Sequence, residues 1–190
     1  VNYDTMTLVV VWIYFRLQSF VFMPVFGLNQ GYLPLVGYNY GHANPERVKK
    51  AIFSGAIISF VFTTFGFLLF QIFPKELILL FNDNPQLIEI GTTALKRISI
   101  AFPIVGFGII GAATFQAIGK GIPSLSMSVF RQLVILLPAM FMLGRMGGLD
   151  TLWFAIPISD ILATSISIIW LYFILKGFME RQAEPGQKIA

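Results

Sequence analysis

The stretch AIFSGAIISFVFTTFGFLLFQIFP, residues 51–74, lies between Lys50 and Lys75 and contains no charged residue. A second run without charge lies between Arg97 and Lys120. A transmembrane helix needs about 20 mostly apolar residues to cross a hydrocarbon core of about 30 Å, and both runs are long enough. They predict that the chain crosses a membrane at least twice.

The composition of the whole 190-residue chain points the same way. Hydrophobic residues make up 56% and charged residues 12%, about half of the roughly 25% that is usual in soluble domains. A soluble domain of this size buries only about 70% of its unfolded surface, so it could not hide this much apolar area. We therefore exclude a soluble globular enzyme and expect a multi-pass protein of the cell membrane.

Three further apolar spans each contain one charged residue, namely Arg16, Arg131 or Asp160. One such charge is compatible with insertion, because it costs about 2.5–3.5 kcal/mol at a helix centre. The predicted fold is an all-α integral membrane protein, a polytopic transmembrane helix bundle in one domain, residues 1–190. Its five spans are expected at about residues 6–40, 51–74, 92–119, 122–143 and 151–175.

Short connections separate these spans. Asn44 and Asn84 each precede a proline, as expected for a helix N-cap followed by the first helical residue. Residues 85–97 are predicted to form an amphipathic lead-in near the lipid headgroups. Gly147-Gly148 marks the fourth connection.

Lys and Arg are unevenly distributed between the two sides of the predicted bundle. One side holds four, and the other holds Arg47, Lys49, Lys50, Lys120, Lys176, Arg181 and Lys188. The positive-inside rule places the richer side, with the C-terminus, in the cytoplasm. Val1 is then outside, and because no signal peptide is visible, we expect at least one helix to precede this chain. The basic residues flank apolar runs, so we expect no nucleic-acid partner.

Asp160 shares a helical face with Pro157, Thr164 and Ser167, and such a polar stripe is unfavourable against lipid. Two interpretations remain open, an interhelical hydrogen-bond seam or a path for substrate or protons. Arg131 lies on a similar stripe with Ser124 and Ser128.

The partner of Asp160 also remains open at this point. Arg16 is expected at a similar depth and would pair with Asp160 if their helices are adjacent. Arg131 is expected about 8 Å away in depth, within reach of its long side chain. One Asp cannot neutralise two Arg residues, which indicates either a hydrated path or an acidic residue in a preceding segment.

Residues 106–111, GFGIIG, match the dinucleotide-binding pattern G-x-G-x-x-G. That motif binds a dinucleotide when it follows a β-strand and lies at the start of a helix. Here it lies inside a predicted membrane helix. Close helix packing is the better interpretation, with Gly108, Ala112 and Gln116 on one face. His42 is expected in a loop, and no Ser-His-Asp set, metal cluster or P-loop is present in the sequence. We therefore expect no enzyme, no metal and no cofactor.

The first span contains FMPVFGLNQGYLPLVGYNYG, residues 22–41. It closely resembles a pattern of the multidrug and toxic compound extrusion (MATE) family, Pro…Gly-x-x-Gln-Gly-x-x-Pro…Gly-x-Asn-x-Gly. The matching residues are Pro24, Gly27, Gln30, Gly31, Pro34, Gly37, Asn39 and Gly41. Further similarities follow in order at residues 115–121, 131–132 and 155–160.

This resemblance implies a transporter of twelve helices in two lobes, which exports cationic or amphipathic compounds in exchange for Na⁺ or H⁺. The present chain is similar to the eighth to twelfth helices, which form most of the C-terminal lobe. Some members have an acidic residue in the tenth helix, but residues 98–119 contain none here. The coupling ion, Na⁺ or H⁺, therefore stays open.

We expect part of a multidrug efflux antiporter that works by alternating access. The path candidates are Arg16, Gln30, Gln116, Arg131 and Asp160, and the residues expected to bend or pack the first helix are Pro24, Gly27, Gly31, Pro34, Gly37 and Asn39. Its partners would be membrane lipids, a missing N-terminal lobe and the exported compounds. The alternatives are a flippase for a lipid-linked sugar and a truncated membrane protein that does not transport.

Overall fold

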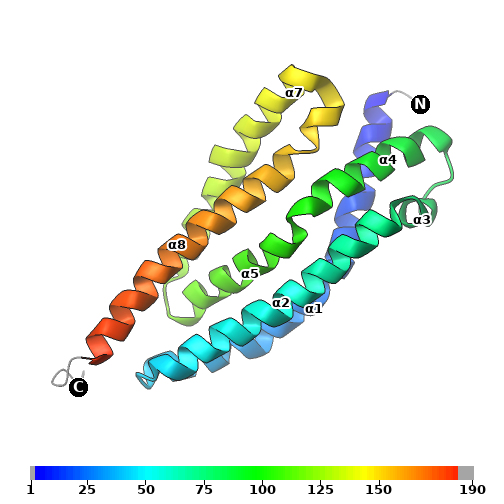
Figure 1. Ribbon diagram of the computed structural model, residues 1–190. Coiled ribbons are helices and arrows are strands. Elements are labelled where there is room, and N and C mark those ends of the chain that lie inside the picture. The colour runs from blue at the N-terminus through cyan, green and yellow to red at the C-terminus, as the bar shows by residue number, and fades with distance from the viewer. Residues whose placement is uncertain (1–2, 184–190) are drawn as a thin grey trace.

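The computed structural model describes residues 3–183, and their regular structure is helical throughout (Figure 1). The long helices are α1 (Tyr3–Gly41), α2 (Pro45–Ile72) and α8 (Ala155–Ala183). The shorter elements are α3 (Pro74–Leu79), α4 (Pro85–Ile98), a 3-10 turn (Ser99–Ala101), α5 (Phe102–Ala117), α6 (Gly121–Val129), a π-helical segment (Phe130–Leu136) and α7 (Leu137–Leu152).

Within this described part, five helical stretches are long and apolar enough to cross a membrane: Thr5–Gly41, Pro45–Ile72, Pro85–Ala117, Gly121–Gly148 and Asp150–Glu180. The predicted fold class, an all-α membrane bundle with about five spans, is therefore confirmed. The structure differs in one respect from the amphipathic lead-in predicted at residues 85–97. These residues form α4, which continues through the 3-10 turn into α5, so they are the first part of the third span.

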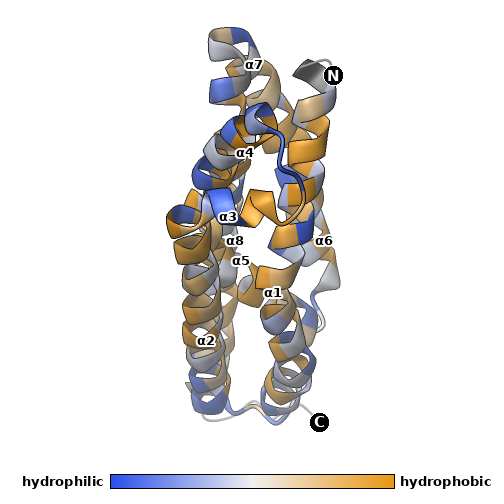
Figure 2. Ribbon diagram, turned by 90° about the vertical axis from the view of Figure 1, so that its right-hand side faces the viewer, coloured by the Kyte–Doolittle hydropathy of each residue, from blue (hydrophilic) through white to orange (hydrophobic). Residues whose placement is uncertain are grey.

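The spans run roughly alongside one another and place the two chain ends at opposite ends of the bundle (Figure 1). Helix α5 packs against α1, α2 and α8, while α6 packs against α5, and the π-helical segment and α7 pack along α8. Apolar residues predominate along the helices, and polar residues concentrate toward the two ends (Figure 2). The α1–α2 connection lies at the same end as the C-terminus, as the alternation of five spans requires.

Side-chain caps begin two of the helices. The Asn44 side-chain oxygen accepts a hydrogen bond from the backbone N–H of Arg47 at 3.1 Å, and that of Asn84 accepts one from Gln86 at 2.9 Å. Each cap satisfies a backbone donor that the first helical turn leaves free. Both predicted N-caps are therefore confirmed.

The fourth connection also lies where the sequence predicts it. Gly147 and Gly148 have non-helical backbone angles, and Gly148 adopts a φ of +64°. L-residues with a side chain rarely adopt this left-handed conformation, so a glycine is required at this turn. Beside the turn, the Arg97 guanidinium forms an ion pair with Asp150 at 3.0 Å and lies over the Phe154 ring. These contacts hold α4 against the connection between α7 and α8.

The G-x-G-x-x-G stretch lies inside α5, where close packing explains it. The Ser59 hydroxyl of α2 donates a hydrogen bond to the Gly106 carbonyl at 3.0 Å. A Cβ atom on Gly106 would lie 2.7 Å from the Thr63 hydroxyl oxygen and 3.2 Å from the Ser59 backbone. Gly106 therefore allows α2 and α5 to approach closely, on a different face of α5 from the predicted packing face of Gly108, Ala112 and Gln116.

We expect Gly106→Ala to lower the free energy of unfolding by about 1–3 kcal/mol, because an added methyl group overpacks this contact. Gly111→Ala in the same helix is the matched control. A Cβ at Gly111 meets no atom within 4 Å, and Ala favours a helix by about 1 kcal/mol over Gly. Thermal unfolding of both purified variants, followed by circular dichroism, tests this. Equal midpoints for the two variants would contradict close packing at Gly106.

Candidate functional site

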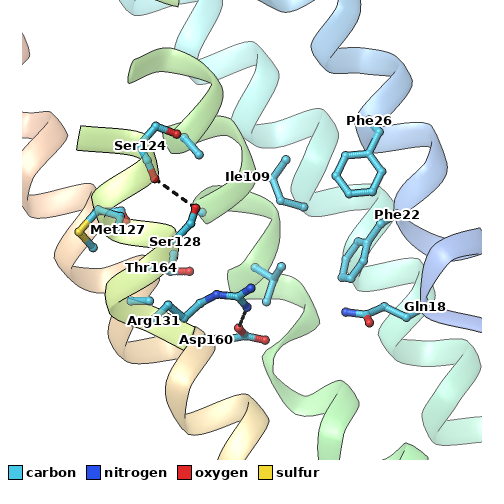
Figure 3. Close-up of a pocket in the computed structure, with 15 residues that line it drawn as sticks. Gln18, Phe22, Phe26, Ile109, Ser124, Met127, Ser128, Arg131, Asp160 and Thr164 are labelled. Atoms are coloured by element: carbon cyan, nitrogen blue, oxygen red, sulfur yellow. Dashed lines mark hydrogen bonds and ion pairs between the residues drawn. The ribbon is translucent and has the colours of Figure 1, made fainter. Parts of the chain in front are cut away.

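A cavity of about 300 Å³ lies between α1, α5, α6 with its π-helical extension, and α8 (Figure 3). It lies within the membrane-spanning segments and not at an end of the bundle. Its polar lining residues are Gln18, Ser124, Ser128, Arg131, Asp160, Thr164 and Ser167. So many polar groups at one place in so apolar a chain make this cavity the candidate functional site.

An ion pair between Arg131 and Asp160 forms the centre of the polar side. The Arg131 guanidinium donates to the Asp160 carboxylate, and Figure 3 shows the two side chains pointing at one another. Asp160 is 8% exposed and Arg131 is 42% exposed, so the guanidinium is the member of the pair that remains open to the cavity. The pair connects α8 to the π-helical segment and neutralises two charges that would each be costly alone.

Arg131 lies in the π-helical segment Phe130–Leu136. A π-helix is wider than an α-helix, and such segments are rare and are frequently found at functional sites. They also change the direction in which the following side chains point. This segment could not be predicted, because composition and spacing do not distinguish a π-helix from an α-helix.

The hydroxyl groups follow the stripes that the sequence predicts. Asp160, Thr164 and Ser167 are buried on one face of α8. Thr164 packs directly on α5, because a Cβ atom on Gly108 would lie 2.5 Å from its hydroxyl oxygen. On the facing helix, the Ser128 hydroxyl donates to the Ser124 carbonyl at 3.1 Å. These serines and threonines surround the ion pair.

The opposite side of the cavity is apolar and partly aromatic. Phe22 and Phe26 project from α1, and Ile109 projects from α5 (Figure 3). Val105 of α5 also lines the cavity. Together with Gln18, these α1 residues recur every four positions and so share one helical face. Sequence reasoning did not single them out, although this spacing was available as a signal. The cavity is therefore amphipathic, with a charged and hydroxyl-rich side facing an aromatic side.

Among the predicted path residues, Arg131 and Asp160 line the cavity, and Gln116 lies beside it. Gln116 donates to the Ser124 hydroxyl at 3.3 Å. Arg16 and Gln30 are exposed on α1 and do not line the cavity. The possible pairing of Arg16 with Asp160 is not observed, because Arg131 on the adjacent helix occupies that carboxylate.

The residues expected to shape the first helix lie on one continuous helix, α1, that includes both prolines. Pro24, Gly27, Gly31 and Pro34 are exposed, whereas Gly37 and Asn39 make contacts. A Cβ atom on Gly37 would lie 3.1 Å from the Ala117 carbonyl oxygen. The buried Asn39 amide donates to the Leu35 carbonyl at 2.7 Å.

His42 lies in the turn after α1, as expected. Its Nδ1 atom is 2.9 Å from the Tyr38 carbonyl oxygen, and its ring stacks on the Tyr38 ring at 4.1 Å. No group of three or more potential metal ligands is present among the described residues.

A five-span helical bundle with an amphipathic cavity inside its spans places this chain among the polytopic membrane proteins. The MatE family model matches residues 2–142, so the chain belongs to this family, as its motifs predict. Members of this family are transporters and not enzymes. The family and the five apolar helices agree with a location in a membrane, while the orientation of the termini remains a prediction.

Known relatives agree with this assignment. The chain is 30% identical over 171 residues to the probable multidrug resistance protein NorM of Thermotoga maritima, covering 88% of this chain and 36% of that protein. It is 26% identical over 147 residues to an FAD transporter of Shewanella oneidensis, covering 77% of this chain and 32% of that protein. The chain thus spans about a third of the length of these relatives.

The fold is also shared with solved structures. An outward-facing conformation of a multidrug resistance MATE family transporter of the MOP superfamily matches with a TM-score of 0.84 at 22% identity. The match covers 90% of this chain and 39% of that chain. The described helices therefore have the fold of part of such a transporter.

We expect the Arg131→Gln variant to unfold more easily by about 3 kcal/mol, because it leaves the Asp160 carboxylate buried without its partner. The double variant Arg131→Gln/Asp160→Asn removes both charges and should recover more than half of this loss. A double-mutant cycle of unfolding in mixed detergent measures the coupling between the two sites. Additive effects of the two substitutions would contradict a stabilising contact between them.

Proposed function

We propose that this chain forms most of the C-terminal lobe of a cation-coupled antiporter that exports drugs or other amphipathic or cationic compounds across the cytoplasmic membrane. The observation that carries the proposal is the amphipathic cavity around Arg131 and Asp160. A second lobe, supplied by the remaining part of the transporter, would form the opposing wall. The C-terminus would face the cytoplasm, in agreement with the distribution of Lys and Arg.

The chemistry of the cavity suits part of an amphipathic molecule. Phe22 and Phe26 offer faces on which a flat apolar ring can pack, and aromatic faces also attract cations. The hydroxyl groups opposite offer hydrogen bonds. A volume of about 300 Å³ is at the lower end for small-molecule sites, which agrees with a site completed by a second lobe.

Asp160 is the acidic residue that lines the cavity, so it is the residue that we assign to coupling. While Arg131 neutralises it, the carboxylate is not available to a cation. Binding of H⁺ or Na⁺ at Asp160 would release the guanidinium and loosen the contact between α8 and the π-helical segment. Alternating access would then couple this local change to movement of the lobes.

A second candidate is the export of an acidic aromatic compound. Arg131 keeps a partly exposed guanidinium inside the cavity, and guanidinium groups bind phosphate in a bidentate manner. The aromatic residues opposite would hold a flat ring system. The similarity to an FAD transporter supports this candidate.

Drug efflux tests the proposal in cells that express this chain together with a matching N-terminal lobe. We expect Ser167→Leu to reduce efflux of a cationic dye at least fivefold, because the larger side chain fills the cavity. Ser165→Leu is the matched control, since Ser165 is exposed two residues away on the same helix and does not line the cavity. Its efflux should remain close to that of the unchanged protein.

Asp160→Asn tests coupling in the same cells. The variant should lose dye efflux driven by an ion gradient but still bind the dye when purified. Equal efflux by Ser167→Leu and Ser165→Leu, together with unchanged efflux by Asp160→Asn, would contradict the proposal. Export of a flavin nucleotide instead of the dye would favour the second candidate.

A further inference from the structure

A groove of about 570 Å³ runs between α1 and α2 and shares no lining residue with the cavity around Arg131. Part of the glycine-rich motif of α1 forms one wall, with Leu28, Gly31, Leu35 and Asn39. The facing wall comes from the first turns of α2, namely Arg47, Lys50, Ala51, Ser54 and Ile58. The efflux mechanism proposed above assigns no role to this groove.

The groove is polar at one end and apolar at the other. Arg47, Lys50 and Ser54 recur at i, i+3 and i+7 along α2, so they lie on one helical face, and Ile58 continues it. Helix α1 runs in the opposite direction, because only a short turn connects the two helices. Asn39 thus lies at the same end of the groove as Arg47 and Lys50, and Gly31 lies farther from that end, toward the middle of the membrane span.

The basic end is not neutralised by the protein. In the part of the chain that the structure describes, ion pairs join Arg97 to Asp150, Arg131 to Asp160 and Lys176 to Glu180. Arg47 and Lys50 take part in none of them, and both are exposed. Glu46 on the same helical turn is exposed and is not paired with either of them.

The apolar end is open because Gly31 has no side chain. A Cβ atom on Gly31 would meet no atom within 4 Å. The walls beside it remain exposed, with Leu35 at 53% and Ile58 at 41%. A long, narrow apolar group therefore has room to lie along the helices at this point.

We propose that this groove is a binding site for an anionic phospholipid. Its phosphate would bind between Arg47 and Lys50, and one acyl chain would lie along Gly31, Leu35 and Ile58. The order of polar and apolar groups in the groove follows that of a lipid from headgroup to tail. Basic pockets between transmembrane helices bind anionic headgroups in this way, and zwitterionic lipids lack the net charge that the two cations select.

Native mass spectrometry of the purified chain tests the headgroup preference, with phosphatidylglycerol and phosphatidylcholine of identical acyl chains as probes. We expect retention of phosphatidylglycerol to exceed that of phosphatidylcholine about tenfold. The Arg47→Gln/Lys50→Gln variant should lose roughly 10- to 30-fold in affinity for phosphatidylglycerol. Lys75→Gln/Lys96→Gln, at the other end of the bundle, is the charge-matched control and should retain it.

A second pair of variants tests the apolar end without changing charge. Gly31→Leu fills the groove and should reduce phosphatidylglycerol retention at least fivefold. Gly27 lies one helical turn from Gly31 and does not line the groove, and a Cβ atom there would also meet no atom within 4 Å. The Gly27→Leu variant should therefore retain the lipid. Circular dichroism of all variants checks that they fold alike. Equal retention of the two lipids, or equal retention by Gly31→Leu and Gly27→Leu, would overturn the proposal.

Discussion

The ion pair between Arg131 and Asp160 joins the fourth and fifth spans at the candidate functional site. Each charge alone would be strongly unfavourable at membrane depth, and the two become tolerable when they neutralise one another. This requirement fixes how the π-helical segment faces α8. Hydroxyl-bearing residues and a cavity lie beside the ion pair, where the guanidinium remains partly exposed.

The fourth span shows why this contact matters. No residue from Leu125 to Gly148 is buried, so apolar packing within this chain contributes little to its position. Polar contacts connect this span to its neighbours instead, through Arg131 to α8 and through Ser124 to Gln116. A change at Asp160 therefore acts on the span that has the fewest other contacts, which is where a transporter can move most easily.

Much of the fold follows from the sequence, because uncharged runs of more than 20 residues leave few alternatives to membrane helices. The Asn44 and Asn84 caps and the stripe from Asp160 to Ser167 follow equally from local spacing. That Asp160 pairs with Arg131 and not with Arg16 could not be predicted, since the residues on one face of a helix do not reveal which other helix packs against that face. The π-helical segment and the contribution of Phe22 and Phe26 likewise depend on tertiary packing.

A polar cavity lies beside Asp160 within the membrane-spanning helices, and we expect it to be open to water. The chain contains no Cys, so a single introduced thiol can be labelled without background. The most direct measurement compares Ser167→Cys with Ser165→Cys, on nearly opposite faces of α8, for reaction with a charged thiol reagent in intact membranes. We expect fast labelling at residue 167 and little at residue 165. Equal rates, or faster labelling at residue 165, would contradict it.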